Sequence, residues 1–154
     1  NQTLAAAAYR LGDDAEAAAA GDAARALRQQ VPPATQDLVR TLSAAQLVDA
    51  LVAARQGRSA DARHLASAAL ARERARAARN QEDEYQRVDL ARALVVAAAA
   101  DVGDRPRELA EATSILARLP ATLRHTRSVE RLRADMATVR AQATGAPTRA
   151  STAR

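Results

Sequence analysis

The sequence predicts an all-α protein in which about seven helices stack as antiparallel hairpins. Alanine accounts for 44 of the 154 residues, and alanine is the best helix former. Alanine also buries little area, so a core made of it is thin and suits helices packed at close range. The five Gly and five Pro are too few for an all-β domain with frequent tight turns. Finally, Gly12, Gly57 and Gly103 recur at spacings of 45 and 46 residues, which indicates an internal repeat.

Each of these glycines is predicted to lie between the two helices of one hairpin. Glycine takes a left-handed conformation without strain, which suits the end of a helix. Polar residues that can cap a following helix come next: Asp13 or Asp14, then Ser59, then Asp104. Small residues four positions before each glycine, such as Ala53, let the paired helices approach closely.

Turn residues and apolar periodicity divide the chain into helices over residues 2–11, 14–29, 34–56, 59–79, 82–102, 106–119 and 122–142. The prolines of "VPP" end the second helix, and Pro106 opens the sixth. The stretch "SAAQ" from Ser43 has the spacing of a capping box and predicts a bend in the third helix. Residues 1–142 are therefore assigned to one helical domain, and residues 143–154, rich in turn formers, to a flexible tail.

Apolar stripes predict which helices are interior. The third and fifth helices each carry two stripes, which indicates packing on two sides. One stripe of the fifth helix consists of Tyr85, Val88, Val95 and Val102. The last helix has a single stripe and an opposite polar face, as a terminal capping helix would; that stripe is Val129, Leu132, Met136 and Val139.

Two stretches, "LAAAAYRLGDDAEAA" and "LVDALVAARQGRSADARHLASAAL", are similar to tetratricopeptide repeats. In that family a small residue lies seven before the mid-repeat glycine, an alanine lies five after it, and Ala-Leu closes the second helix. The matching residues here are Ala50, Gly57, Ala62 and Ala69-Leu70. The period of about 45 exceeds the family's 34, and the large aromatics and the closing proline are missing. The likeness covers residues 1–140 and implies a right-handed superhelix whose first helices line a concave, peptide-binding groove.

Residues able to carry catalysis or hold a cofactor are sparse. The chain has no Cys, and His64 and His125 each lack a second His at metal-ligand spacing. No phosphate-binding glycine loop is present, and all 23 basic residues are Arg. The acidic pairs at Asp13 and at residues 82–84 fall at predicted helix starts, where they complement the helix dipole. We therefore expect no enzyme activity, no metal and no cofactor.

The net charge of +5 is concentrated near the C-terminus, where residues 121–154 hold seven Arg against Glu130 and Asp135. Arg124, Arg127 and Arg131 form a predicted stripe on the last helix; it is either a solvated face or a surface for an anionic partner. In the run "ARERARAARN" (71–80), the residues Arg72, Arg76 and Arg79 share a helix face. The acidic start of the next helix follows at once, so we expect ion pairs between these helix ends.

The leading hypothesis is a scaffold that binds a protein or peptide, as a regulatory part of a longer, cytoplasmic bacterial protein. The chain begins at Asn1 rather than Met, and "ALVVAAAA" (93–100) is too short to span a membrane. The residues expected to bind the partner are polar or basic ones on the odd-numbered helices: Gln46, Asp49, Arg55, Asp89, Arg92, Arg124 and Arg127. Two alternatives stay open. One is a basic domain associated with nucleic acid, and the other is a bundle that dimerises through the apolar face of its first or last helix.

Overall fold

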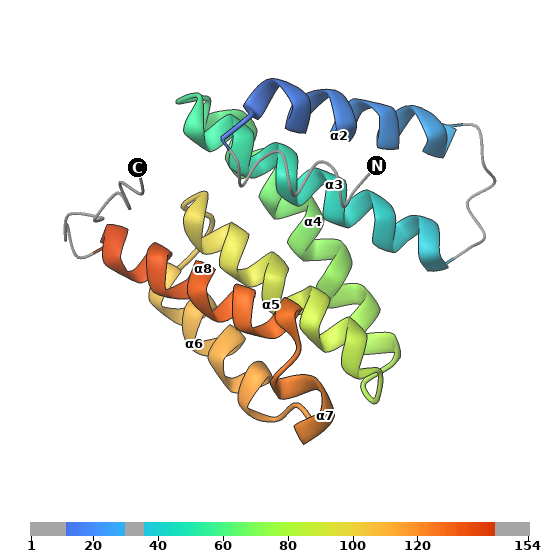
Figure 1. The fold of residues 1–154 in the computed structure, drawn as a ribbon, viewed down its shortest axis with the longest axis vertical. Helices are drawn as coiled ribbons and strands as arrows, with labels where there is room; N and C mark the ends of the chain where they lie inside the picture. Colours follow the sequence, from blue (N-terminus) through green and yellow to red (C-terminus); the bar gives the residue numbers. More distant parts are fainter. Residues whose placement is uncertain (1–11, 30–35, 144–154) are drawn as a thin grey trace.

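The computed structural model describes residues 12–29 and 36–143, and within them the chain is all-helical (Figure 1). Seven helices and no strand make up this part of the chain. They are α2 (Asp14–Gln29), α3 (Gln36–Arg55), α4 (Ser59–Arg79), α5 (Glu84–Ala99), α6 (Arg105–Ala117), α7 (Ala121–Arg124) and α8 (Arg127–Ala143). The predictions for α2 and α4 are confirmed at both ends. The helix expected over residues 2–11 lies outside the described residues, and so does the tail beyond Ala143.

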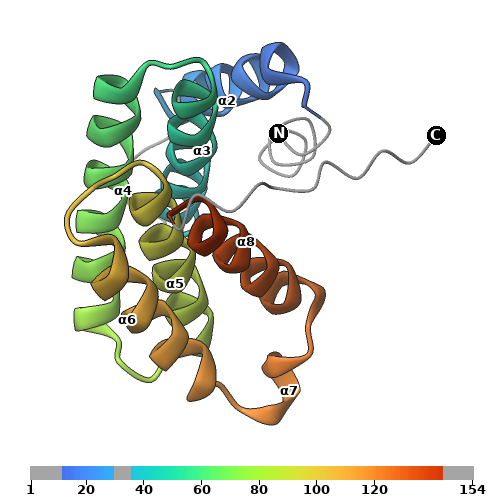
Figure 2. The same ribbon diagram turned by 90° about the vertical axis from the view of Figure 1, so that its left-hand side faces the viewer.

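Successive helices pack side by side, since α2 contacts α3, α3 contacts α4, α4 contacts α5, and α5 contacts α6. Figure 2 shows α4 and α6 together on one side of the molecule, with α3, α5 and α8 following one another along the other side. Helix α5 also contacts α3 and α8. It is therefore the central helix, in contact with α3, α4, α6 and α8.

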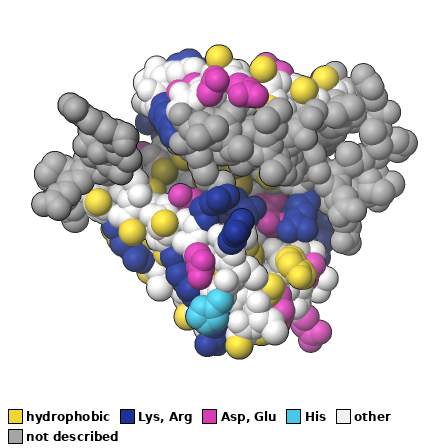
Figure 3. Space-filling model, in the orientation of Figure 1, with side chains coloured by type: hydrophobic (Ala, Val, Ile, Leu, Met, Phe, Trp, Pro, Cys, Tyr) yellow, Lys and Arg dark blue, Asp and Glu magenta, His cyan; other side chains and the backbone are white. Residues whose placement is uncertain are grey.

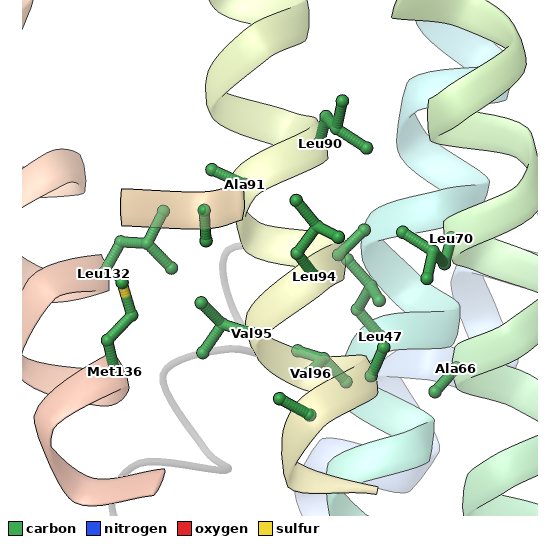
Figure 4. Packing of buried hydrophobic residues seen from close by; sticks show 14 of the residues in the cluster. Leu47, Ala66, Leu70, Leu90, Ala91, Leu94, Val95, Val96, Leu132 and Met136 are labelled. Carbon is green, nitrogen blue, oxygen red and sulfur yellow. The ribbon is translucent and has the colours of Figure 1, made fainter. Parts of the chain in front are cut away.

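The apolar core explains this central place. Helix α5 buries eleven of its sixteen residues, among them Leu94, which is completely enclosed. In Figure 4 Leu94 points toward Leu47 of α3 and Leu70 of α4, whereas Leu132 of α8 lies on the opposite side of α5. The expected two-sided packing of this helix is thus confirmed. The prediction that Tyr85 belongs to its core stripe is wrong, because Tyr85 is 59% exposed.

Alanine provides much of this core. Of 31 buried hydrophobic residues in the described part of the chain, 14 are Ala. Ala53 on α3 and Ala62 and Ala66 on α4 are at most 1% exposed and belong to one apolar cluster. Their single methyl groups allow the helix axes to approach closely, which was the packing reason expected for small residues around Gly57.

The turn at Gly57 follows the prediction. Gly57 has φ +73°, its N–H donates to Ala54 O at 3.1 Å, and Arg58 N–H donates to Ala53 O at 2.8 Å. This pair of bonds is a Schellman motif, which satisfies the last free carbonyls of α3.

In the third hairpin the left-handed residue that ends the first helix is an aspartate instead of a glycine. Helix α5 already ends at Ala99, and Asp101 takes the left-handed conformation with φ +59°. Val102 N–H donates to Ala97 O at 2.9 Å, as Arg58 does to Ala53. Asp101 therefore occupies the position of Gly57, and the repeat alignment on Gly103 is wrong by two residues. The fifth helix is shorter than expected for the same reason.

Side-chain caps were predicted correctly where aspartate is available. The Asp13 carboxylate accepts from Glu16 N–H at 2.9 Å, and Asp104 caps α6 by accepting from Arg107 N–H at 3.2 Å. Ser59 is not a cap: it is the first residue of α4, and Arg58 precedes it without a capping side chain.

Two further predictions about helix continuity are wrong. Helix α3 runs unbroken through "SAAQ", with Ser43 buried in mid-helix, because α3 is packed against α2, α4 and α5.

The helix expected over residues 122–142 is instead two helices, α7 and α8. The break comes at His125–Thr126, where Thr126 Oγ1 donates back to Leu123 O and the chain changes direction (Figure 2). The apolar stripe of α8 can then lie against α5.

Candidate functional site

A cluster of polar side chains links α3, α5 and α8 on the side of the molecule where these three helices follow one another. At its centre is Asp89 of α5, whose side chain is 9% exposed. Asp89 Oδ2 lies 2.7 Å from Nε of Arg40 on α3, and Oδ1 accepts from Nη1 of Arg92 at 3.2 Å. One buried carboxylate is therefore shared by two arginines from different helices.

The two arginines have further contacts. Arg92 Nη2 donates to Ser128 Oγ at 3.0 Å, so the chain of contacts continues from α5 to the first turn of α8. The guanidinium of Arg40 lies 6.0 Å from the centre of the Tyr85 ring, within the range of a cation–π contact. We call these five residues, Arg40, Tyr85, Asp89, Arg92 and Ser128, the arginine cluster.

Charge and exposure define what this cluster can do. Two guanidinium groups face one carboxylate, which leaves one positive charge in excess. The side chains of Arg40 and Arg92 are 47% and 37% exposed, so both keep N–H groups that water or a ligand can reach. Figure 3 shows arginine side chains, with acidic ones beside them, near the middle of the face formed by α3, α5 and α8.

The structure brings two of the expected binding residues, Asp89 and Arg92, into this cluster. Gln46 and Asp49 lie further along α3; Asp49 is buried and Gln46 is half-buried, with its Oε1 in no hydrogen bond. Arg55 lies at the far end of α3, where its Nη1 bonds to Asp14 Oδ1 of α2 at 3.0 Å.

The other two expected residues do not form the predicted stripe. Arg124 belongs to α7 and bonds through Nε to Leu119 O, whereas Arg127 begins α8 and is exposed. A stripe of Arg124, Arg127 and Arg131 on one helix is therefore wrong, although all three side chains are exposed.

Three members of the cluster were missed. Arg40 meets the same criterion as the residues that were chosen, a basic residue on an odd-numbered helix, and could have been included. Tyr85 was assigned to the core, although its rarity is a signal, since the chain has only two Tyr and no Phe or Trp. Nothing in the sequence points to Ser128.

The run at residues 71–80 pairs differently from the prediction. Arg76 forms an ion pair with Glu73 of its own helix at 2.7 Å rather than with the acidic start of α5. Arg74 reaches across to α6 and contacts Glu108 and Glu111 at 3.1 and 3.0 Å. Arg74 and Arg76 therefore take part in holding the fold together.

No group of three metal-ligating side chains occurs among residues 12–29 and 36–143, and none of the helices in these ranges is long and apolar enough to cross a membrane. No family model matches the chain, and no match was found among the curated proteins or the solved structures.

Proposed function

We propose that this chain is a non-catalytic module that binds a protein or peptide, and that the arginine cluster receives a carboxylate of the partner. The observation that supports this most directly is the sharing of Asp89 between Arg40 and Arg92. Holding two guanidinium groups in place in advance lowers the entropy lost when a ligand binds.

The chemistry of the cluster favours an acidic ligand. Asp89 neutralises one of the two arginines, so a second carboxylate restores charge balance. Arginine binds carboxylates through two parallel N–H···O bonds, and such charge-assisted bonds are stronger than neutral ones. Tyr85 is beside Arg40 and is 59% exposed, which gives an apolar side chain of the same peptide a surface to cover.

The arrangement of the helices supports a tetratricopeptide-like stack as the scaffold. Helices α3 and α5 are each the first helix of a hairpin. Helix α8 comes next, where the first helix of a further hairpin would lie. Helix α5 contacts both α3 and α8, which supports a row formed by these three helices. In such a stack a peptide lies across the first helices, where the cluster is.

The test is selection from a phage library of random twelve-residue peptides on the wild-type protein, followed by anisotropy measurements on selected peptides. We expect enrichment of peptides with Asp or Glu next to an apolar residue. Replacing that acid by its amide should weaken binding about tenfold or more, since a hydrogen bond to a charged group contributes about 1.5–3 kcal/mol.

The matched variants are Arg40→Gln/Arg92→Gln and Arg63→Gln/Arg107→Gln. Both remove two exposed charges, but Arg63 and Arg107 belong to no ion pair among the described residues. The first variant should lose the selected peptides and the second should keep them. Selection that yields no acidic consensus, or equal binding by both variants, would show that the cluster does not serve this role.

A second copy of the chain is not favoured as the partner of α8. Its apolar stripe, which the sequence left available for dimerisation, is at most 6% exposed and packs within the chain. Outside that stripe, α8 carries four Arg and two acids.

A further inference from the structure

Charge is distributed unevenly along the described chain. Residues 112–143 contain six Arg and only two acids, Glu130 and Asp135. Among the described residues, the ion pairs whose two partners can be named all lie between Asp14 and Glu111, and Glu130 belongs to none of them. The C-terminal part of the structure therefore carries an excess of positive charge.

The arginines of this part are oriented by neutral groups. Arg118 Nε donates to Ser114 O at 3.2 Å, Arg124 Nε donates to Leu119 O, and Arg133 Nη1 donates to Arg124 O at 3.0 Å. A carbonyl accepts the hydrogen bond and leaves the full positive charge in place. Each guanidinium also keeps donors beyond the one used, because arginine has five.

One of these contacts brings two arginines of different helices, Arg124 and Arg133, together. Arg133 of α8 donates to the backbone of Arg124 in α7, and Arg124 donates to the backbone of Leu119 in the loop that follows α6. Arg127 and Arg131 lie on the same first two turns of α8 and are exposed, as are the others. We call this set the basic surface: Arg118, Arg124, Arg127, Arg131 and Arg133.

We propose that the basic surface binds the phosphate backbone of double-stranded nucleic acid without reading its sequence. Phosphate contacts from arginine need positive charge and free N–H donors, and binding follows from the release of counterions. The basic surface shares no residue with the arginine cluster, although Ser128 of that cluster adjoins Arg127 on α8.

The apolar composition of this surface distinguishes nucleic acid from an acidic protein. Protein interfaces draw most of their energy from buried aromatic and apolar anchors. No large hydrophobic side chain is exposed among residues 105–143, so α6, α7 and α8 offer no such anchor. The same lack of aromatics argues against single strands, which bind by base stacking.

The experiment measures the anisotropy of a labelled 25-base-pair duplex of random sequence as a function of salt. For about five phosphate contacts, affinity should fall by roughly 500-fold between 50 and 200 mM salt. The variant Arg127→Gln/Arg131→Gln/Arg133→Gln should bind more weakly and show only about a 12-fold fall, since about two contacts remain. Glutamine keeps a helix propensity close to that of arginine, so α8 should stay folded.

The control is Arg63→Gln/Arg79→Gln/Arg107→Gln, which removes the same net charge from exposed positions on α4 and α6. It should bind within about twofold of the wild type. Absence of duplex binding at 50 mM salt, or equal loss in both triple variants, would overturn the proposal. So would displacement of the duplex by polyglutamate as readily as by unlabelled duplex, because the surface would then recognise acidic protein equally well.

Discussion

Glu73 and Arg76, one turn apart on α4, form an ion pair that is almost completely buried. Arg76 Nη1 lies 2.7 Å from Oε2 and 3.0 Å from Oε1 of Glu73, and the two side chains are 14% and 1% exposed. A carboxylate so deeply buried keeps its charge at tolerable cost only while its partner is present.

Removing one partner of this pair should therefore lower the free energy of unfolding far more than replacing both partners. We expect Arg76→Ala to lower the free energy of unfolding by about 3–5 kcal/mol, because it leaves an uncompensated buried charge. The double variant Glu73→Leu/Arg76→Met should lie within about 1–2 kcal/mol of the wild type, since apolar residues of similar volume replace the pair. Urea denaturation followed by circular dichroism measures both, and equal losses would contradict the proposed role of the pair.

Replacing a buried alanine of α4 by a larger residue should destabilise the fold. Ala66 is completely buried, so Ala66→Leu should cost about 1–3 kcal/mol through overpacking. Ala60, on the exposed part of the same helix, is the matched control, and Ala60→Leu should change stability by less than about 0.5 kcal/mol. Thermal and urea unfolding of the two variants would test this, and a loss of similar size in both would show that packing is not the cause.

Replacing Gly57 and replacing Asp101, which both have positive φ, should change the free energy of unfolding in opposite directions. Gly57→Ala places a Cβ at φ +73° and should cost about 1 kcal/mol, although the space around it is open. Asp101→Gly relieves a side chain from φ +59° and should raise the free energy of unfolding by several tenths of a kcal/mol, up to about 1. Chemical denaturation resolves both changes, and destabilisation by Asp101→Gly would show that its carboxylate matters more than its conformation.

The start of α5 should depend on one cap. The Asp83 carboxylate accepts from Tyr85 N–H at 2.9 Å and Gln86 N–H at 3.1 Å. We expect Asp83→Ala to cost about 1 kcal/mol and Asp83→Asn distinctly less, because the amide oxygen can still accept these bonds. Glu82→Ala changes a neighbouring acid that is exposed and outside the cap, and the melting temperature should stay near that of the wild type.

Local chemistry in the sequence was enough to predict much of this fold. Asp14 and Gln29 bound α2 as expected, because prolines follow it and acids open it, and Gly57 ends α3 as expected. The end of α5 was placed too late because Asp101 takes the conformation expected of a glycine, and aspartate is among the few residues that tolerate the left-handed region. The break before α8 depends on the apolar stripe reaching α5, which is a long-range requirement.

The candidate site likewise combines residues that could be predicted from local sequence with residues that depend on long-range contacts. Asp89 and Arg92 could be chosen because they are polar residues on a helix expected to face a partner. Their partners could not, since Arg92 meets Ser128 across 36 residues of sequence. Tyr85 was misassigned because helical periodicity identifies a face of α5, but it does not show whether a neighbouring helix covers that face at a given turn.

The alanine-built core also has a consequence for how stability varies with temperature. The heat capacity of unfolding grows with the apolar area that unfolding exposes, by about 0.45 cal/mol/K per Å². Fourteen of the 31 buried hydrophobic residues expose only a methyl group each when the chain unfolds. The heat capacity change should therefore fall below the usual value of about 12–15 cal/mol/K per residue. The free energy of unfolding should then vary less steeply with temperature. Such a chain holds a modest free energy of unfolding over a broad temperature span instead of a sharp maximum.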